Sequence, residues 1–221
     1  MIEQQETTRL EKAILLATVA HQGQIDDDGQ PHIIHSLEVM FALKRELDAR
    51  PQLLPEGYTV EDMMIAAVLH DVPEDTSLTV DDIHRDFGRK IADCVDGVTR
   101  RHGDPLCKQA NCKEHSKESY RDFIYRAAKK PASKLLKIAD LGVNRKRTHL
   151  IPASKAKWAA KLEYKYDISL RLLFAEEPIT WEQASWQFSD GKYFVADPNG
   201  KKVEVTKEQF DGLMEAARVV N

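Results

Sequence analysis

The feature that most constrains this chain of 221 residues is an apolar run that ends in a charged pair. Residues 63–69, MMIAAVL, are apolar without a break, and His70 and Asp71 follow at once. A helix that is apolar on all sides belongs in the centre of a helical bundle. A charged pair at its end is costly unless another group or a cation satisfies it. The sequence therefore predicts a helical core with a polar site at the end of one buried helix.

The rest of the pattern is also mainly helical. Apolar residues recur at helical spacing in five further stretches, namely 8–21, 79–87, 88–98, 132–148 and 153–175, and a helix is also expected at 116–129. Ser36 is the expected cap of another helix, Pro73 should end or bend the apolar one, and no strand is expected before residue 190. Asn199-Gly200 predicts a β-hairpin turn, and Thr206 with Gln209 predicts a capping box.

A second polar interruption occurs at Asp140, inside the apolar stretch LLKIADLGV. Lys137, Asp140, Asn144 and Arg147 are spaced i, i+3, i+7 and i+10, so they form one polar stripe of a helix. Gly142 in the same helix is expected to permit a close approach. Imidazole and carboxylate groups together suit Mn, Fe or Zn, so His70, Asp71 and Asp140 are candidate metal ligands.

Five segments carry a resemblance to a known family. AHQGQ, GQPHIIHSLEV, AVLHDVPEDT, DFGRKIADCVDGVTR and LLKIADLGVN occur in the family's order within residues 17–148. Together they resemble the HD-domain metal phosphohydrolases, in particular the hydrolase domain of the RelA/SpoT alarmone enzymes. The resemblance implies an HD-domain helical bundle over residues 1–178. Residues 179–221 then form a C-terminal appendage, a β-hairpin followed by a helix.

The resemblance also implies a site and a reaction. The implied metal is Mn²⁺, with Zn²⁺ or Fe²⁺ as alternatives, and the implied ligands are His35, His70, Asp71 and Asp140. Glu74 and Asp75 match the acidic pair that positions and activates the attacking water, and Asn144 matches a nucleotide contact. The family removes pyrophosphate from the 3′ position of guanosine tetra- or pentaphosphate. Transition-state charge on phosphate needs cations, for which Lys137 and Arg147 are candidates.

Several positions depart from the family. Residues 25–28, Ile-Asp-Asp-Asp, stand where a basic pair is common, and three aspartates would repel phosphate. Either the cations come from elsewhere, or the substrate differs, or this is a solvated loop without a role. His32 replaces a usual Tyr and Ser36 a usual Pro, and Arg147 is only an approximate match.

Three functions follow as hypotheses. The first is a stand-alone alarmone hydrolase that converts guanosine 3′,5′-bis(diphosphate), ppGpp, to GDP and pyrophosphate. The second is an HD phosphohydrolase acting on another nucleotide, such as an adenosine alarmone, a nucleoside monophosphate or NADPH. The third is a non-catalytic nucleotide sensor or a toxin-neutralising partner. The acidic pair Glu74 and Asp75 argues against the third, because a pure binder needs no water-activating acids.

Composition narrows the partners. The net charge of −4 disfavours nucleic acid, and no stretch reaches the roughly 18 apolar residues of a membrane span. Without a signal-peptide pattern, the expected location is the cytoplasm, and self-association stays open. Residues 1–100 hold 9 Lys/Arg against 20 Asp/Glu, whereas residues 129–165 hold 11 against 2. Folding is expected to bring these two regions together around a small nucleotide.

The remaining candidates have structural interpretations. His21 lies on an apolar face and is expected to brace the site, and Cys94 is expected in the core. Cys107, Cys112 and His115, with spacing C-x₄-C-x₂-H, do not match a standard zinc knuckle. The three tryptophans are expected to be packing anchors, at positions 158, 181 and 186.

Overall fold

Helices dominate the part of the chain that the computed structural model describes, which is residues 6–101, 117–176 and 178–218. The first helices are α1 (Arg9–Ala20), α2 (His32–Ala49), α3 (Val60–Leu69), α4 (Val72–Asp75), α5 (Val80–Phe87) and α6 (Arg89–Val98), with a 3-10 turn at Pro51–Leu53. Next come α7 (Tyr120–Ala128), α8 (Pro131–Arg147) and α9 (Ala156–Phe174), with 3-10 turns at Thr148–Leu150 and Ala153–Lys155. The C-terminal segment contains α10 (Trp181–Ser185), β1 (Gln187–Ser189), β2 (Lys192–Ala196), β3 (Lys202–Val205) and α11 (Lys207–Arg218).

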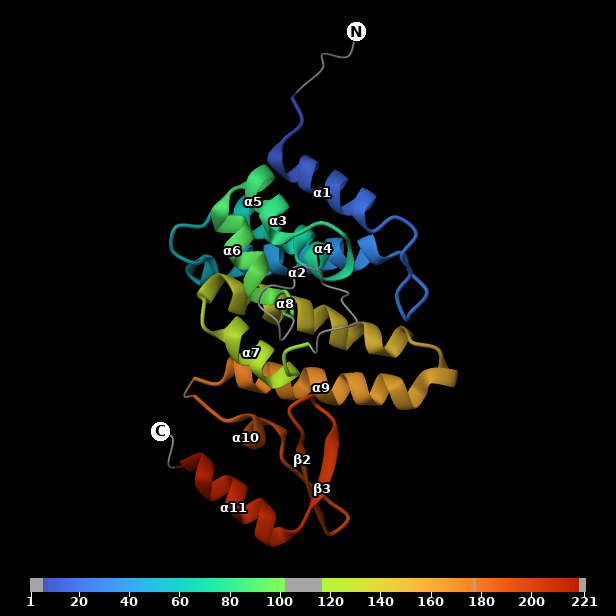
Figure 1. The fold of residues 1–221 in the computed structure, drawn as a ribbon, viewed down its shortest axis with the longest axis vertical. Coiled ribbons are helices and arrows are strands. Elements are labelled where there is room, and N and C mark those ends of the chain that lie inside the picture. Colours follow the sequence, from blue (N-terminus) through green and yellow to red (C-terminus); the bar gives the residue numbers. More distant parts are fainter. Residues whose placement is uncertain (1–5, 102–116, 177, 219–221) are drawn as a thin grey trace.

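The apolar run forms the central helix α3, as predicted. Thr59 and Asp62 close a capping box at its start, and the side chains from Ile65 to Leu69 are buried. The helix packs between α1, α2 and α6 in the upper layer of Figure 1. The main hydrophobic cluster therefore surrounds the helix that ends at His70.

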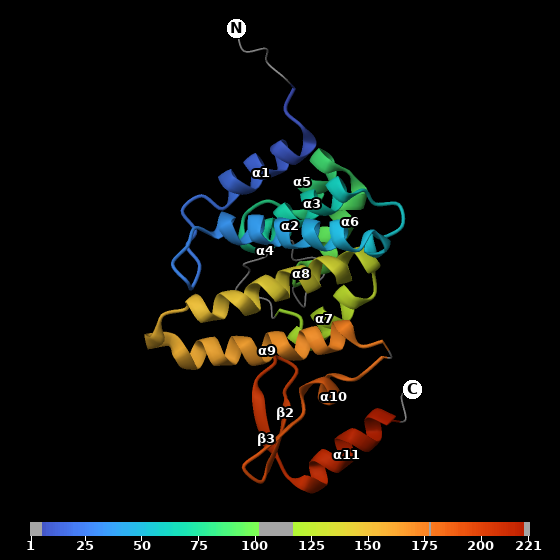
Figure 2. The ribbon, with the colours of Figure 1, turned by 180° about the vertical axis from the view of Figure 1, so that it is seen from behind.

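A second hydrophobic cluster lies below the first. It joins α7, α8 and α9 to the C-terminal segment, and Trp181 is fully buried within it. Figures 1 and 2 show the chain passing from the α1–α6 layer through α8 and α9 to the strands and α11. Because this cluster includes Leu141 of α8 and Ala196 of β2, it crosses the predicted boundary at residue 178, and the two-domain division stays a prediction. No helix in the described ranges is long and apolar enough to cross a membrane.

The C-terminal strands extend the prediction and correct it. The predicted hairpin is present as β2 and β3, but β1 adds a third antiparallel strand, so the expectation of no strand before residue 190 was wrong. The dipeptide Asp190-Gly191, with φ of 53° and 76°, connects β1 to β2 and is a hairpin signal in the sequence. In the second turn only Gly200 has a positive φ, of 80°, and Asn199 does not.

Two local predictions were also wrong. Ser36 does not cap a helix, because α2 begins at His32 after Pro31 and Ser36 is buried within it. Gly142 allows no close approach, since a Cβ there would meet nothing within 4 Å. Gly97 of α6 is the glycine at a helix contact, because a Cβ there would lie 2.0 Å from Ser133 Oγ of α8. Cys94 is buried in the core, as predicted.

Candidate metal centre

His70 ends the apolar helix with its imidazole in one defined tautomer. The side chain is 1% exposed, and Nδ1 lies 2.8 Å from the carbonyl oxygen of Ala67. A carbonyl can only accept, so Nδ1 carries the hydrogen and Nε2 presents a lone pair. That Nε2 is buried without a hydrogen-bond partner and lies 3.0 Å from Oδ2 of Asp71. A lone pair facing a carboxylate is stable only with a cation between them.

The other predicted ligands reach the same point from two more helices. His35 of α2 places Nε2 3.4 Å from Oδ2 of Asp71 and 3.3 Å from Oδ1 of Asp140. Oδ1 of Asp140, on α8, lies 3.5 Å from Nε2 of His70. The structure thus brings together all four predicted ligands, although they are distant in sequence.

The electrostatics of this cluster favour a cation. Burial alone would lower the pKa of His70, but Asp71 and Asp140 raise it well above its usual value. Burial would raise the pKa of Asp140, but Lys137 and the two histidines lower it well below the usual range. The ligand atoms of His35, His70 and Asp71 lie within 4.8 Å of one another. Two imidazoles and two carboxylates in this arrangement fit a divalent metal ion, and the orphaned Nε2 supports that fit.

Lys137 and Asn144 both hold Asp140. The ammonium of Lys137 donates to Oδ2 of Asp140 at 2.7 Å, and the amide of Asn144 donates to Oδ1 at 2.5 Å. The polar stripe predicted on this helix is therefore present in α8. Its members orient a candidate ligand, as outer groups commonly do in metal sites.

The acidic pair of α4 divides between two directions. Asp75 faces the site, where its carboxyl, with those of His32 and Asp71, lies in a second group of ligand atoms within 4.8 Å. Although Asp75 is partly open to solvent, desolvation followed by the charges of Asp71 and Glu74 raises its pKa to about 6. Glu74 instead accepts a 3.1 Å hydrogen bond from the backbone N–H of Arg100.

Two residues near the site carry more than the sequence indicated. His32 places Nε2 3.4 Å from Asp71 and Nδ1 2.7 Å from Asp26, and after the opposing effect of burial these carboxylates raise its pKa to about 9. Gln24 donates a 2.8 Å hydrogen bond to the carbonyl of Asp75 and another bonds it to His21. The ring of His21 lies 4.2 Å from that of His32, behind the predicted ligands. The substitution at His32 and the AHQGQ motif were the available signals.

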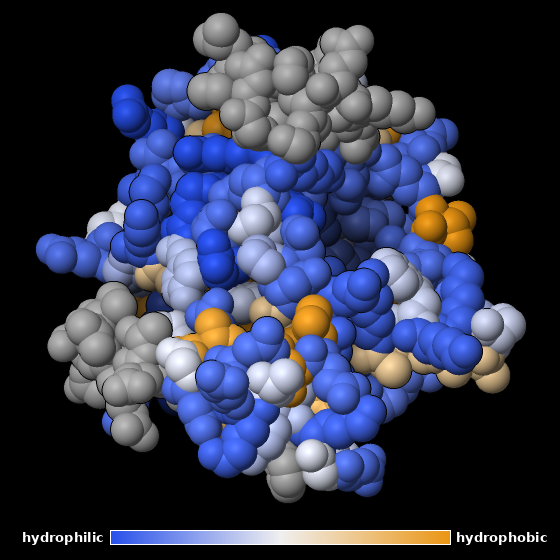
Figure 3. Space-filling view, turned by 60° about the horizontal axis from the view of Figure 1, so that its bottom comes forward, coloured by the Kyte–Doolittle hydropathy of each residue, from blue (hydrophilic) through white to orange (hydrophobic). Residues whose placement is uncertain are grey.

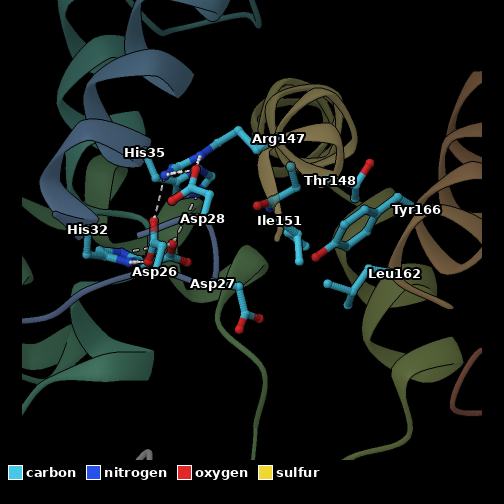
Figure 4. A pocket seen from close by; sticks show the side chains of 12 residues that line it. Asp26, Asp27, Asp28, His32, His35, Arg147, Thr148, Ile151, Leu162 and Tyr166 are labelled. Atoms are coloured by element: carbon cyan, nitrogen blue, oxygen red, sulfur yellow. Dashed lines mark hydrogen bonds and ion pairs between the residues drawn. The ribbon is translucent and has the colours of Figure 1, made fainter. Parts of the chain in front are cut away.

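The three aspartates of the 25–28 segment line the pocket in front of the metal ligands (Figure 4). The pocket has a volume of about 170 Å³ and includes His35, Asp71 and Tyr166 among its lining residues. Arg147 also lines it, but its guanidinium is paired with Asp28 at 2.6 Å and Asp26 at 3.1 Å. The acidic and basic regions of the chain therefore meet here, as expected.

Asp27 forms the third link of this segment. Its carboxylate accepts hydrogen bonds of 2.8 Å from Lys155 and from the indole N–H of Trp158. Trp158 is 42% exposed, so its predicted role as a packing anchor was wrong, whereas Trp181 is fully buried. Trp186 is 46% exposed and contacts Phe210, with ring centroids 5.6 Å apart. Cys107, Cys112 and His115 lie outside the described residues.

Comparisons with known proteins agree with this geometry. The chain is 30% identical over 214 residues to a guanosine-3′,5′-bis(diphosphate) 3′-pyrophosphohydrolase of Aquifex aeolicus, covering 97% of this chain and 28% of that relative. It is 33% identical over 148 residues to the bifunctional (p)ppGpp synthase/hydrolase SpoT of Escherichia coli, covering 67% of this chain and 18% of SpoT. The chain thus spans less than a third of either relative.

The fold has a solved counterpart. A metazoan ortholog of SpoT that hydrolyses ppGpp matches with a TM-score of 0.53 and 22% identity, over 77% of this chain and 96% of that one. At this identity the likeness shows the helical fold. A family model described as HD domain matches residues 13–141, which is more than half of the chain. Sequence, fold and the convergence of His35, His70, Asp71 and Asp140 agree, and the chain belongs to the HD-domain family.

Proposed function

We propose that this chain is a metal-dependent phosphohydrolase that releases pyrophosphate from the 3′ position of ppGpp and leaves GDP. The observation that carries the proposal is the buried cluster of His35, His70, Asp71 and Asp140, with the carboxyl of Asp75 beside it. The two curated relatives, whose names include this hydrolysis, support it. A cytoplasmic location and self-association stay predictions.

The proposed metal is Mn²⁺, held by His35, His70, Asp71 and Asp140. When bound, a divalent ion supplies polarisation of a phosphoryl oxygen and of a nearby water. Lys137 and Asn144 keep both oxygens of Asp140 in place, which limits the conformations of this ligand. A direct contact of Lys137 or Asn144 with the substrate remains a proposal, in which the unused hydrogens of the Lys137 ammonium face a phosphate.

Asp75 is the proposed general base. With a pKa of about 6 it is largely ionised at neutral pH, yet basic enough to accept a proton from the attacking water. Glu74 is the proposed positioning residue, because its bonds to the Arg100 backbone and, at 3.5 Å, to Lys117 fix the short helix α4. Gln24 secures α4 from the other side through the carbonyl of Asp75.

One observation favours a different nucleotide as substrate. Asp26 and Asp27 line the pocket, and Arg147 is already neutralised by Asp26 and Asp28. Carboxylates accept hydrogen bonds from hydroxyl and amino groups and repel phosphate, so this wall suits the sugar or base of a ligand. Arg147 as a phosphate contact accordingly requires that it leave its aspartate partners.

The test is turnover by the purified protein with Mn²⁺. Incubation with ppGpp should yield GDP and pyrophosphate, and Asp140→Asn should yield neither. A parallel panel of the adenosine analogue, nucleoside monophosphates and NADPH distinguishes the second candidate, in which another member is preferred. Asp27→Lys should raise ppGpp turnover if the acidic wall selects against phosphate. Nucleotide binding without any turnover by metal-loaded protein would overturn both hydrolase candidates in favour of a binding protein.

A further inference from the structure

Lys165 of α9 is a half-buried lysine without a counter-ion among the described residues. Its ammonium lies 4.7 Å from the ring centroid of Tyr120 and 5.1 Å from that of Tyr166. Aromatic faces attract a cation but leave its three hydrogens without strong acceptors. The ammonium is therefore held in position and keeps hydrogen-bonding capacity for a ligand.

Other cations converge on the same place. The guanidinium carbon of Arg100 lies 5.9 Å from the same Tyr120 ring. Lys137, the partner of Asp140, is buried nearby. Burial, followed by the charges of Lys137 and Arg100, lowers the pKa of Lys165 to about 8. A group of like charges is destabilising by itself, so an anion bound among them would be strongly favoured.

The turn between β2 and β3 builds this arrangement. It lies against α9 in both ribbon views (Figures 1 and 2). A Cβ on Gly200 would lie 2.8 Å from Cγ of Lys165, so the turn packs directly on the lysine stem. Asn199 accepts a 3.4 Å hydrogen bond from Arg100, and Pro198 accepts one of 2.8 Å from the Arg121 backbone. The C-terminal appendage thus constrains both Lys165 and Arg100.

This cation cluster adjoins the metal centre at the end opposite the aspartates. Lys137 and Arg147 are ten residues apart on α8, which corresponds to about 15 Å along the helix axis. Tyr166, whose ring contacts Lys165, lines the pocket together with His35 and Asp71. Within the largely hydrophilic face of Figure 3, which brings the C-terminal segment forward, such a cluster has access to a polar ligand. The site therefore has an acidic end and a basic end.

We propose that Lys165 and Arg100 form an anion subsite that holds the distal phosphate of the substrate's pyrophosphate group. This subsite rests on the proposed function, and it assigns the C-terminal hairpin a positioning role through Asn199 and Gly200. It also identifies where cations come from in a chain that has aspartates in the 25–28 segment. The metal centre then holds the phosphate that is attacked or its neighbour, while the subsite orients the leaving group.

The first experiment measures binding of inorganic pyrophosphate to metal-free protein by calorimetry, since free metal would sequester the probe. Lys165→Met should weaken binding by about tenfold or more, the usual effect of losing a charge-assisted hydrogen bond. Lys157→Met, an exposed lysine on the same helix, is the matched control and should bind as the wild type. Lys165→Arg should retain most of the affinity, and Asn199→Ala should weaken it several-fold by freeing Arg100. Wild-type affinity in folded Lys165→Met, or in Asn199→Ala if that variant fails to fold, would overturn the subsite.

The second experiment separates the subsite from the proposed function. With Mn²⁺ and ppGpp, Lys165→Met should raise KM by about tenfold, whereas a substrate carrying a single 3′-phosphate should show no such dependence. If pyrophosphate binding needs Lys165 but ppGpp is not hydrolysed, the subsite stands and the proposed reaction is wrong. If ppGpp is hydrolysed but neither pyrophosphate affinity nor KM responds to Lys165, the reaction stands and the subsite is wrong.

Discussion

Arg147 and Asp28 form a nearly buried ion pair between segments 119 residues apart. Nε of Arg147 donates to Oδ2 of Asp28 at 2.7 Å, and Nη2 lies 2.6 Å from the same oxygen. The side chains are 10% and 3% exposed. Because Asp26 also contacts this guanidinium, one arginine ties the acidic segment to the end of α8.

Arg147→Ala should therefore be strongly destabilising. Removing one partner of a buried pair leaves an uncompensated charge, which typically lowers the free energy of unfolding by about 3–5 kcal/mol. Urea denaturation measures the change. Arg145→Ala is the matched control, because its pairs with Asp167 and Glu163 are exposed and exposed pairs contribute about 0–1 kcal/mol. Equal effects of the two variants would show that the Arg147 pair is not a structural tie.

Mn²⁺ should stabilise the wild-type protein. A ligand that binds only the folded state at about 100 times its Kd adds about 2.7 kcal/mol, which for a chain of this size raises Tm by several degrees. Asp140→Asn should reduce both the shift and the bound metal measured by mass spectrometry. Asp93→Asn, on the exposed face of α6, should behave as the wild type. The metal assignment fails if Asp140→Asn retains a full complement of metal.

Asp75→Asn should abolish turnover and stabilise the metal-free protein. The folded pKa of about 6 is above the ordinary value of 3.8, so ionisation of Asp75 opposes folding. This penalty is absent below about pH 4, grows as pH rises toward 6 and is complete above it. Thermal denaturation should thus show a larger advantage of the variant at pH 8 than at pH 5. An advantage independent of pH would contradict the raised pKa.

Two glycine substitutions should have opposite effects. Gly97→Ala would place a Cβ 2.0 Å from Ser133 Oγ and 2.6 Å from Ser133 Cβ, so α6 and α8 must separate. Overpacking of this kind lowers the free energy of unfolding by about 1–3 kcal/mol. Gly142→Ala meets nothing within 4 Å and should raise it by up to about 1 kcal/mol through helix propensity. Chemical denaturation compares them, and stabilisation by Gly97→Ala would refute the close helix contact.

The sequence determined the helices and the ligand set. Helical periodicity and capping are local, so α3, α5 and α6 lie close to where the pattern predicted them. The wrong predictions concern short signals with several readings. Ser36 resembles a cap but is buried in α2, and the weak alternation before residue 190 concealed β1.

Only the tertiary structure decided how charges are paired. Nothing local indicates that Asp28 neutralises Arg147, that Glu74 turns to the Arg100 backbone, or that Gly200 packs on Lys165. Each contact joins elements whose distance depends on the packing of whole helices, and a charge has no periodicity that reveals its partner. The sequence thus specifies which groups are available for chemistry, whereas packing determines which of them remain free for a substrate.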